Sequence, residues 1–219
     1  MTVKQLAALY GRYLRDALPG TAVRRSLVYL HPVGDLLRGC HFESSGPGGT
    51  RFVVHAFVQP LYVPFPSVDL TCGTRLGPGR ERWFDLASEP EERVMAEVLR
   101  LIRTQAMPLF QRFAEPAHFA RHGEELVSNT KAPDFVQAVA YSHLLAGEYV
   151  RAAAQLAGML ASLQARPDLR PFEREMLRRN QQLEATLRDR PADAVADLRQ
   201  WRRETLRGIG LEDEYGPAR

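Results

Sequence analysis

The hydrophobic pattern changes along this chain of 219 residues from a period of two to a period near 3.6. Between residues 23 and 76, short segments rich in β-branched and aromatic residues are separated by turn residues, which is typical of antiparallel strands. From residue 89 onward, apolar residues recur every three or four positions, which is typical of amphipathic helices. Because strands and helices are segregated, the pattern predicts an α+β fold.

Four strands are predicted in the first half. Their ranges are 23–31, 36–43, 50–59 and 68–76. The segment SSGPGG at 44–49 predicts a hairpin between the second and third strands. The third strand has apolar residues on both faces, so we expect a central strand that is covered on both sides. Three prolines within 60–66 predict an irregular connection before the fourth strand.

Helices are predicted before and after the strands in the sequence. The first covers 2–18, and a second begins at a capping box formed by Ser88 and Glu91 and runs to 113, with a kink or an end at Pro108. The polar stretch 115–133 has no sustained period and is expected to be a boundary. Four further helices are expected over 134–146, 148–163, 172–188 and 192–207.

The domain organisation follows from this pattern. The sequence predicts a domain over 1–115, with a four-stranded antiparallel sheet and flanking helices, and an all-helical bundle over 133–210. These two halves are either separate domains or packed as one unit.

Composition narrows the class of protein. Hydrophobic residues make up 45% and charged residues 25%, which is ordinary for a globular chain and argues against disorder. No apolar run reaches the ~18 residues of a membrane-spanning helix, and the first residues lack the pattern of a signal peptide. We therefore expect a cytoplasmic protein without a membrane partner.

The charge pattern does not favour nucleic acid. The formal net charge is only +3, and the chain has two lysines, so nearly all its basic residues are arginines. Ten arginines between 170 and 207 alternate with acidic residues at spacings that allow ion pairs on a helix surface. A solvated, salt-bridged face is favoured over binding to RNA or DNA.

One group of polar residues in the predicted sheet is a candidate site. If strands two, three and four are neighbours, then His41, His55, Asp69 and Arg75 share one face because all have odd numbers. A histidine base, an orienting aspartate and an anion-binding arginine would suit a small hydrolase or an anion-binding protein. The alternative is a core histidine and an ion pair at the edge of the sheet.

Other candidate chemistry is sparse. Cys40 and Cys72 are expected on the opposite face, two strands apart, as two free and buried thiols. His118 and His122 have the i, i+4 spacing of metal ligands, but no third ligand has suitable spacing, so neither a metal nor a cofactor is predicted. The glycine-rich phosphate and dinucleotide motifs and the GxSxG motif of serine hydrolases do not occur.

Two resemblances add to this reading. The segment SHLLAGEYVRAAAQLAGML resembles one tetratricopeptide-type hairpin, with Gly147, Tyr149 and Ala152 at its turn, aromatic and small positions. The segments CGTRLGPGRERWFDL (72–86) and MPLFQRF (107–113) resemble a family of uncharacterised bacterial domains with a helix, an antiparallel meander and a closing helix. That resemblance implies no catalytic residues, and some such domains occur near toxin systems.

The sequence therefore leads to two functional hypotheses. The first is a non-enzymatic interaction, adaptor or immunity-type protein whose partner is another protein. The second is a small hydrolase or anion-binding protein that uses the cluster of His41, His55, Asp69 and Arg75. The sequence does not indicate an oligomeric state.

Overall fold

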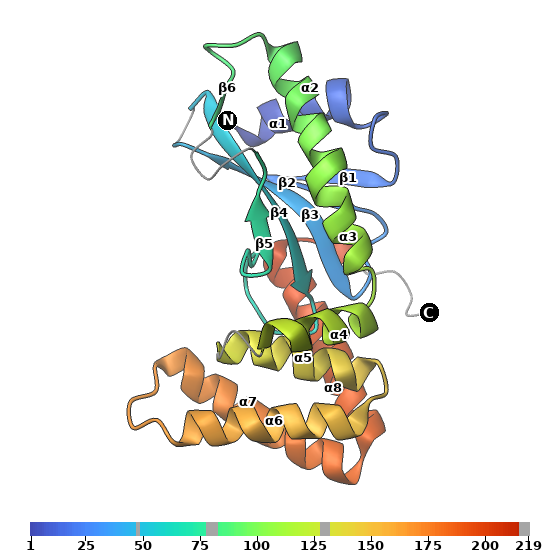
Figure 1. The fold of residues 1–219 in the computed structure, drawn as a ribbon, viewed down its shortest axis with the longest axis vertical. Coiled ribbons are helices and arrows are strands. Elements are labelled where there is room, and N and C mark those ends of the chain that lie inside the picture. Colours follow the sequence, from blue (N-terminus) through green and yellow to red (C-terminus); the bar gives the residue numbers. More distant parts are fainter. Residues whose placement is uncertain (47–48, 78–82, 128–131, 215–219) are drawn as a thin grey trace. The chain divides into compact units, whose positions relative to one another are not determined.

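The computed structural model describes residues 1–46, 49–77, 83–127 and 132–214. Its fold is α+β, as predicted, with an antiparallel sheet in the first half and helices in the second (Figure 1). The chain divides into two compact units. The sheet unit comprises Met1–Gln59 and Val68–Phe113, and the helical unit comprises Pro60–Ser67 and Ala114–Pro217.

Within the described residues the sheet has six strands rather than the four predicted. They are β1 (Thr21–Arg24), β2 (Leu27–Leu30), β3 (Leu36–Ser44), β4 (Arg51–Pro60), β5 (Gly73–Arg75) and β6 (Phe84–Asp85). Their order is β1-β2-β3-β4-β5, and β6 also pairs with β4.

The first predicted strand, 23–31, is a hairpin instead. Arg25 has φ 52°, a left-handed conformation that reverses the chain after β1. β1 and β2 then pair in an antiparallel register from Thr21 opposite Leu30 to Arg24 opposite Leu27. The apolar run alone did not show this reversal, because its turn consists of two ordinary polar residues, Arg25 and Ser26.

The fourth predicted strand, 68–76, is reduced to the three residues of β5. The Asp69 carboxylate accepts hydrogen bonds from the backbone N–H (2.9 Å) and the hydroxyl (2.6 Å) of Thr71. The Asp69 N–H donates to the Gln59 side chain (3.0 Å) instead of a ladder carbonyl. This local turn competes with strand pairing, so the ladder begins only at Gly73.

β4 is the central strand, as predicted, because it lies between β3 and β5. Phe52 and Phe57 point to opposite faces and are both fully buried. On the Phe52 face, its ring packs between Phe42 of β3 and Phe84 of β6, with ring centroids 5.9 and 5.3 Å away. This aromatic stack forms the centre of the core of the sheet unit.

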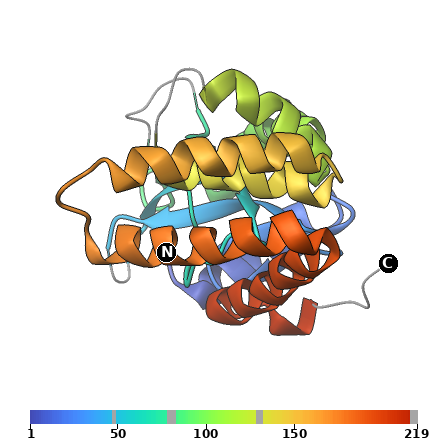
Figure 2. The same ribbon diagram turned by 90° about the horizontal axis from the view of Figure 1, so that it is seen from below.

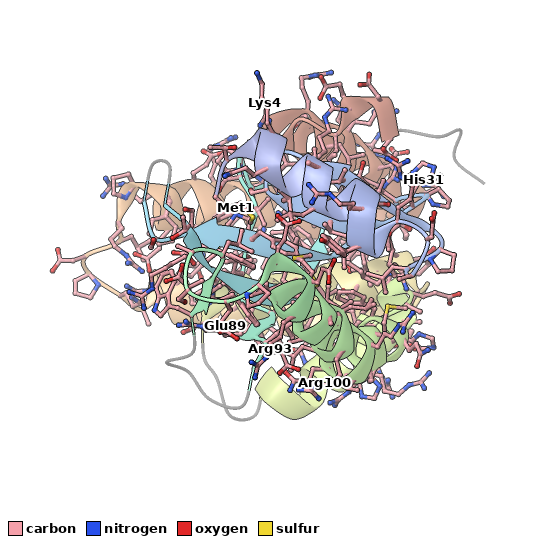
Figure 3. The ribbon with its side chains drawn as sticks, turned by 90° about the horizontal axis from the view of Figure 1, so that it is seen from above. Met1, Lys4, His31, Glu89, Arg93 and Arg100 are labelled. Atoms are coloured by element: carbon pink, nitrogen blue, oxygen red, sulfur yellow. The ribbon has the colours of Figure 1, made fainter. Side chains whose placement is uncertain are left out.

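Helices cover the sheet unit. The first helical run is α1 (Val3–Leu9) followed by the π-helix η1 (Tyr10–Leu14), and the second is α2 (Glu91–Leu101), the π-helix η2 (Ile102–Ala106) and α3 (Met107–Arg112). Figure 3 shows α1 and α2 side by side, and an ion pair joins Arg12 to Glu91. The Arg38 guanidinium of β3 donates to the carbonyl of Phe110 (3.2 Å), which ties the second run to the sheet.

Two details of the second run differ from prediction. Its N-cap is Pro90, without a side-chain cap, so the expected capping box of Ser88 and Glu91 does not form. At Pro108 the run does not end but continues as α3, and the N–H of Met107 reaches back five residues to the carbonyl of Ile102. This wider π-turn precedes the proline, which has no N–H to donate.

The helical unit contains five main helices among the described residues. They are α4 (Pro116–Val127), α5 (Pro133–Leu145), α6 (Tyr149–Gln164), α7 (Pro171–Asp189) and α8 (Pro191–Ile209), followed by the short 3-10 helix η3 (Glu212–Glu214). Figure 2 shows α6 and α7 side by side, and α6 also packs on α5.

α4 corrects the expectation that 115–133 is an aperiodic boundary. Gly123 lies within this helix and serves packing, because a Cβ there would collide with Val139 Cγ2 of α5. Phe119 of α4 is buried against Phe135 of α5, with ring centroids 6.1 Å apart. The glycine therefore permits close approach of two helices rather than a turn.

Buried polar contacts organise the helical unit around α5. The hydroxyls of Tyr62 and Ser142 lie 2.5 Å apart, so the irregular 60–67 connection is held among the helices. Gln137 donates to the Tyr141 hydroxyl (2.6 Å), which in turn donates to Asn180 of α7 (2.9 Å). Each of these side chains is buried, and pairing offsets the desolvation of its polar atoms.

The turn between α5 and α6 is closed by Gly147. It has φ 78°, its N–H bonds to the carbonyl of Leu144, and the N–H of Glu148 bonds to the carbonyl of His143. This is a Schellman C-cap, which strongly favours glycine. The His143 ring is fully buried, with its nitrogens 2.6 Å from Glu148 and 2.9 Å from Glu124 of α4, and the bond to His143 lowers the pKa of Glu148.

The connection from α6 to α7 is fixed by Glu173. Its side chain is only 1% exposed and accepts hydrogen bonds from the guanidinium groups of Arg170 and Arg166 and from the Arg170 backbone N–H. These bonds, with those from Arg170 first, lower the pKa of Glu173 to about 2. The segment between α6 and α7 is thus ordered by a carboxylate in the first turn of α7.

Gly147 and Gly158 both lie in the hairpin of α5 and α6, and together they give a matched test of the turn between these helices. A Cβ meets nothing within 4 Å at either Gly147 or Gly158, but only Gly147 has a positive φ. Gly147→Ala should therefore lower the free energy of unfolding by about 1–2 kcal/mol. Gly158→Ala, within α6, should raise it by up to about 1 kcal/mol. Urea denaturation measures both, and a stabilising Gly147→Ala would contradict the assigned turn.

The Glu173 contacts predict a dependence of stability on pH. A carboxylate whose pKa is lowered in the folded state stabilises the fold above its unfolded pKa and loses this effect as the pH falls through the folded value. The loss of stability caused by Glu173→Gln should therefore be largest at pH 7. The difference in stability from wild type should shrink below about pH 4.5 towards pH 2. Thermal unfolding across this range tests it; a difference independent of pH would contradict the charged contact.

Candidate functional site

The sheet brings three of the four predicted site residues together. His41 lies on β3, His55 on β4 and Arg75 on β5, and these strands are neighbours. His55 and Arg75 are direct partners in the β4–β5 register, so their side chains share a face. The structure thus agrees with the sequence prediction that these three residues, which all have odd numbers, share one face of the sheet.

Asp69 lies apart from this group. It precedes β5, where the chain has moved along β4 from His55 towards Gln59, whose side chain it contacts. Its carboxylate is occupied by the turn at Thr71. The role of orienting carboxylate that the sequence suggested for Asp69 has no geometric support.

A different carboxylate meets the histidines. The Oε2 atom of Glu43, two residues after His41 on β3, lies 3.1 Å from Nε2 of His55. Burial lowers the pKa of His41; the charge of Glu43 opposes this effect, and His55 reinforces it. Glu43 and His55 are therefore close enough to influence the protonation of His41.

Trp83 completes the group. The guanidinium carbons of Arg75 and Arg51 lie 5.2 and 5.6 Å from the centroid of its ring, within the range of cation–π contact. Asp85 of β6 is the register partner of Arg51, and its pKa is lowered mainly by the Ala87 N–H, with a smaller contribution from Arg51. We refer to His41, Glu43, His55, Arg75, Arg51 and Trp83 as the sheet-face cluster.

Sequence reasoning missed part of this cluster although one signal was present. Glu43 lies on the same strand as His41 and also has an odd number, so the alternation of side chains that placed His41 on this face applied to Glu43 too. Arg51 has an odd number on β4. Trp83 precedes β6, and no periodic pattern around it predicted its position. Chemically, the cluster combines two imidazoles, a carboxylate and two guanidinium groups, which can exchange protons and attract anions.

A second candidate surface lies between α6 and α7. It is a groove of about 380 Å³ that we call the α6–α7 groove, and it is lined by Tyr149, Val150, Ala153, Ala157, Glu184, Leu187 and Arg188. Val150 is 86% exposed and Tyr149 is 42% exposed, so two adjacent large side chains border the groove without being covered. Glu184 and Arg188 place one charge of each sign on the α7 side.

A third hollow, of about 410 Å³, lies along α2 near Phe84. Figure 3 shows Glu89, Arg93 and Arg100 along this side of the helix. Arg100 makes a bidentate contact with Glu97 (2.7 and 2.9 Å), and Arg93 lies 3.9 Å from Glu89. Because both arginines lie beside acidic residues three or four positions earlier in the chain, this hollow offers little uncompensated charge to a ligand.

The arginine-rich face is salt-bridged on α7, as expected. Arg178 and Arg179 both contact Glu175, at 2.8 and 3.4 Å, and Arg190 contacts Asp193 at 2.8 Å. On α8, the Arg203 guanidinium donates to the side chain of Gln200. The sequence-based expectation of ion pairs is thus confirmed for α7 and its junction with α8.

Across the described ranges, no group of three or more His, Cys, Asp or Glu side chains is placed to hold a metal ion; His118 and His122 both lie on α4. None of the helices in the described part of the chain is long and apolar enough to cross a membrane.

Comparison with known proteins gives no relative. No protein-family model, no curated protein and no solved structure matches the chain.

The two cysteines are both free, but their exposure differs. Cys40 on β3 is buried, and burial raises the pKa of its thiol to about 12. Cys72 is half-buried because it lies just before the shortened β5. The expectation of two buried thiols is therefore right for Cys40 and wrong for Cys72.

This difference predicts two rates of thiol labelling. In the native protein at pH 8, Cys72 should react readily with a disulfide reagent, whereas Cys40 should react only as the protein unfolds. Cys72→Ser should remove the fast phase and leave the slow one. Equal and fast reaction of both thiols in the native state would contradict the burial of Cys40.

Proposed function

We propose that this protein is a non-enzymatic interaction protein that binds another protein through the α6–α7 groove. The observation that carries the proposal is the exposure of Val150 and Tyr149 beside an apolar groove. Single exposed apolar residues are common on protein surfaces, but a large aliphatic and an aromatic side chain that flank a groove are typical of binding sites.

The groove suits an apolar segment of helical form. Ala153 and Ala157 are one turn apart on α6, and their small side chains allow a partner helix to approach closely. Tyr149 and Val150 supply larger apolar area at one end. Glu184 and Arg188 supply charges that a partner can match to fix its orientation.

The scaffold behind the groove is well fixed. Leu187 is buried beneath it, and α6 begins directly after the Schellman turn at Gly147. A groove whose supporting helices are already ordered loses little conformational entropy on binding. The resemblance of the first half to domains found near toxin systems adds a specific form of the proposal, in which the partner is a toxin.

Substitution of Val150 tests the proposal. Burying a valine side chain contributes about 1.5–3 kcal/mol, so Val150→Asp should weaken partner binding by about tenfold or more. Val3→Asp is the matched control, because Val3 is also exposed (55%) but lies on α1 of the sheet unit. Quantitative affinity capture from the source cells should show partners that wild type and Val3→Asp retain and Val150→Asp loses.

Two outcomes would count against this function. One is a set of captured proteins that is identical for all three forms. The other is self-association of the purified protein that Val150→Asp abolishes, as measured by sedimentation, because the groove would then bind a second copy of this chain. Far-UV circular dichroism of each variant establishes that the helices are intact.

A further inference from the structure

Two charged side chains of the α6–α7 groove are unpaired. Glu184 and Arg188 both line the groove, and neither side chain forms a hydrogen bond or an ion pair with any described residue. They lie four residues apart on α7 with the acidic residue first, which is the arrangement that best favours an ion pair within a helix. Because this pair does not form, both charges are available to a third group in the groove.

The unpaired glutamate differs from the other two glutamates of α7, which both contact arginines. Glu175 contacts Arg178 and Arg179, and Glu173 contacts Arg170. The residues that α6 contributes to the groove lining are all uncharged. The charge of the groove is therefore set by one acidic and one basic side chain of α7, which lie about one helical turn apart.

Covering these two charges restricts what can bind. In the free protein Glu184 is half-buried and Arg188 is exposed, so water reaches both. A partner that fills the groove removes this water, and the loss is unfavourable unless the partner brings an opposite charge to each side chain. A partner with charges of one sign only would match one of the two residues and repel the other. Such repulsion gives specificity against the wrong partner.

The apolar wall of the groove favours a helix as its occupant. Ala153 and Ala157 are one turn apart on α6, so small side chains line this wall at helical spacing. A helix that lies along the groove presents its own side chains at the same spacing. A basic and an acidic residue four positions apart on that helix can therefore reach Glu184 and Arg188 together.

We propose that the α6–α7 groove selects an amphipathic helix of the partner protein that carries one basic and one acidic side chain, four residues apart, beside its apolar face. The basic side chain contacts Glu184, and the acidic one contacts Arg188. Both residues are then determinants of specificity, whereas Tyr149 and Val150 supply apolar area. The selection rests on the function proposed above, because it specifies the segment of the partner that the same groove binds.

Three synthetic peptides with the same apolar face test this selection. Each is an alanine-rich helix of about 20 residues, and two positions four apart hold lysine and glutamate, two lysines or two glutamates. Each peptide is titrated into the full-length protein, and the NMR shifts of the Val150 and Ala153 methyl groups report binding at the groove. Wild type should bind the lysine–glutamate peptide about three- to tenfold more tightly than either of the others.

Charge variants should change this preference in a defined direction. Glu184→Lys leaves two basic side chains in the groove, so the two-glutamate peptide should become the tightest ligand. Arg188→Glu leaves two acidic ones, so the two-lysine peptide should become the tightest; because Arg188 is exposed, this variant decides the matter even if Glu184→Lys fails to fold. Glu204→Lys, at an exposed position on α8, makes the same change in net charge as Glu184→Lys and should keep the preference of wild type.

Different failures separate this selection from the function on which it rests. Equal affinity for the three peptides, with Val150→Asp weakening all of them, would overturn the selection and leave the groove as a binding site. A preference that neither charge variant changes would do the same. Failure of all three peptides to bind would overturn the selection and count against the groove itself. Self-association that Arg188→Glu abolishes, measured by sedimentation, would identify a second copy of this chain as the occupant and overturn both.

Discussion

The contact between the hydroxyls of Tyr62 and Ser142 is the constraint on which the organisation of the chain depends. Tyr62 lies in the connection between β4 and β5, yet its side chain is buried in the helical unit. A buried hydroxyl requires a partner, and Ser142 of α5 provides it. Thr205 of α8 binds the carbonyl of Val63 in the same connection. The helical unit is therefore built from two separate stretches of chain.

The need of buried polar atoms for hydrogen-bond partners also fixes how the helices around α5 are positioned. α5 is buried on nearly every side. Its Tyr141 and His143 each meet a partner from a helix or turn beside it, and Gln137 donates to Tyr141 within α5. Apolar packing alone tolerates small rotations of a helix, whereas paired polar atoms accept few arrangements. With the inner faces fixed in this way, the outer surface of α6 is left to bind, which is consistent with the role we propose for the α6–α7 groove.

β4 serves two purposes along its length. Phe52 and Phe57 bury its two faces and make it the centre of the core, whereas His55 between them carries polar chemistry on one face. Period-two geometry makes this possible, because neighbouring residues point in opposite directions. A rigid central strand is a good support for a site, since its register fixes where His55 and Arg75 lie.

The sequence by itself determined the features that depend on local periodicity. The α+β class, strands β3 and β4, the turn at Gly147 and the helices after residue 133 follow from spacing and turn chemistry, as does the shared face of His41, His55 and Arg75. Only the tertiary structure decided the hairpin at Arg25, the packing role of Gly123, the burial of Tyr62, and the replacement of Asp69 by Glu43. The last three depend on contacts between residues far apart in the chain, and the hairpin at Arg25 turns on two ordinary polar residues, so residue spacing alone indicates none of the four.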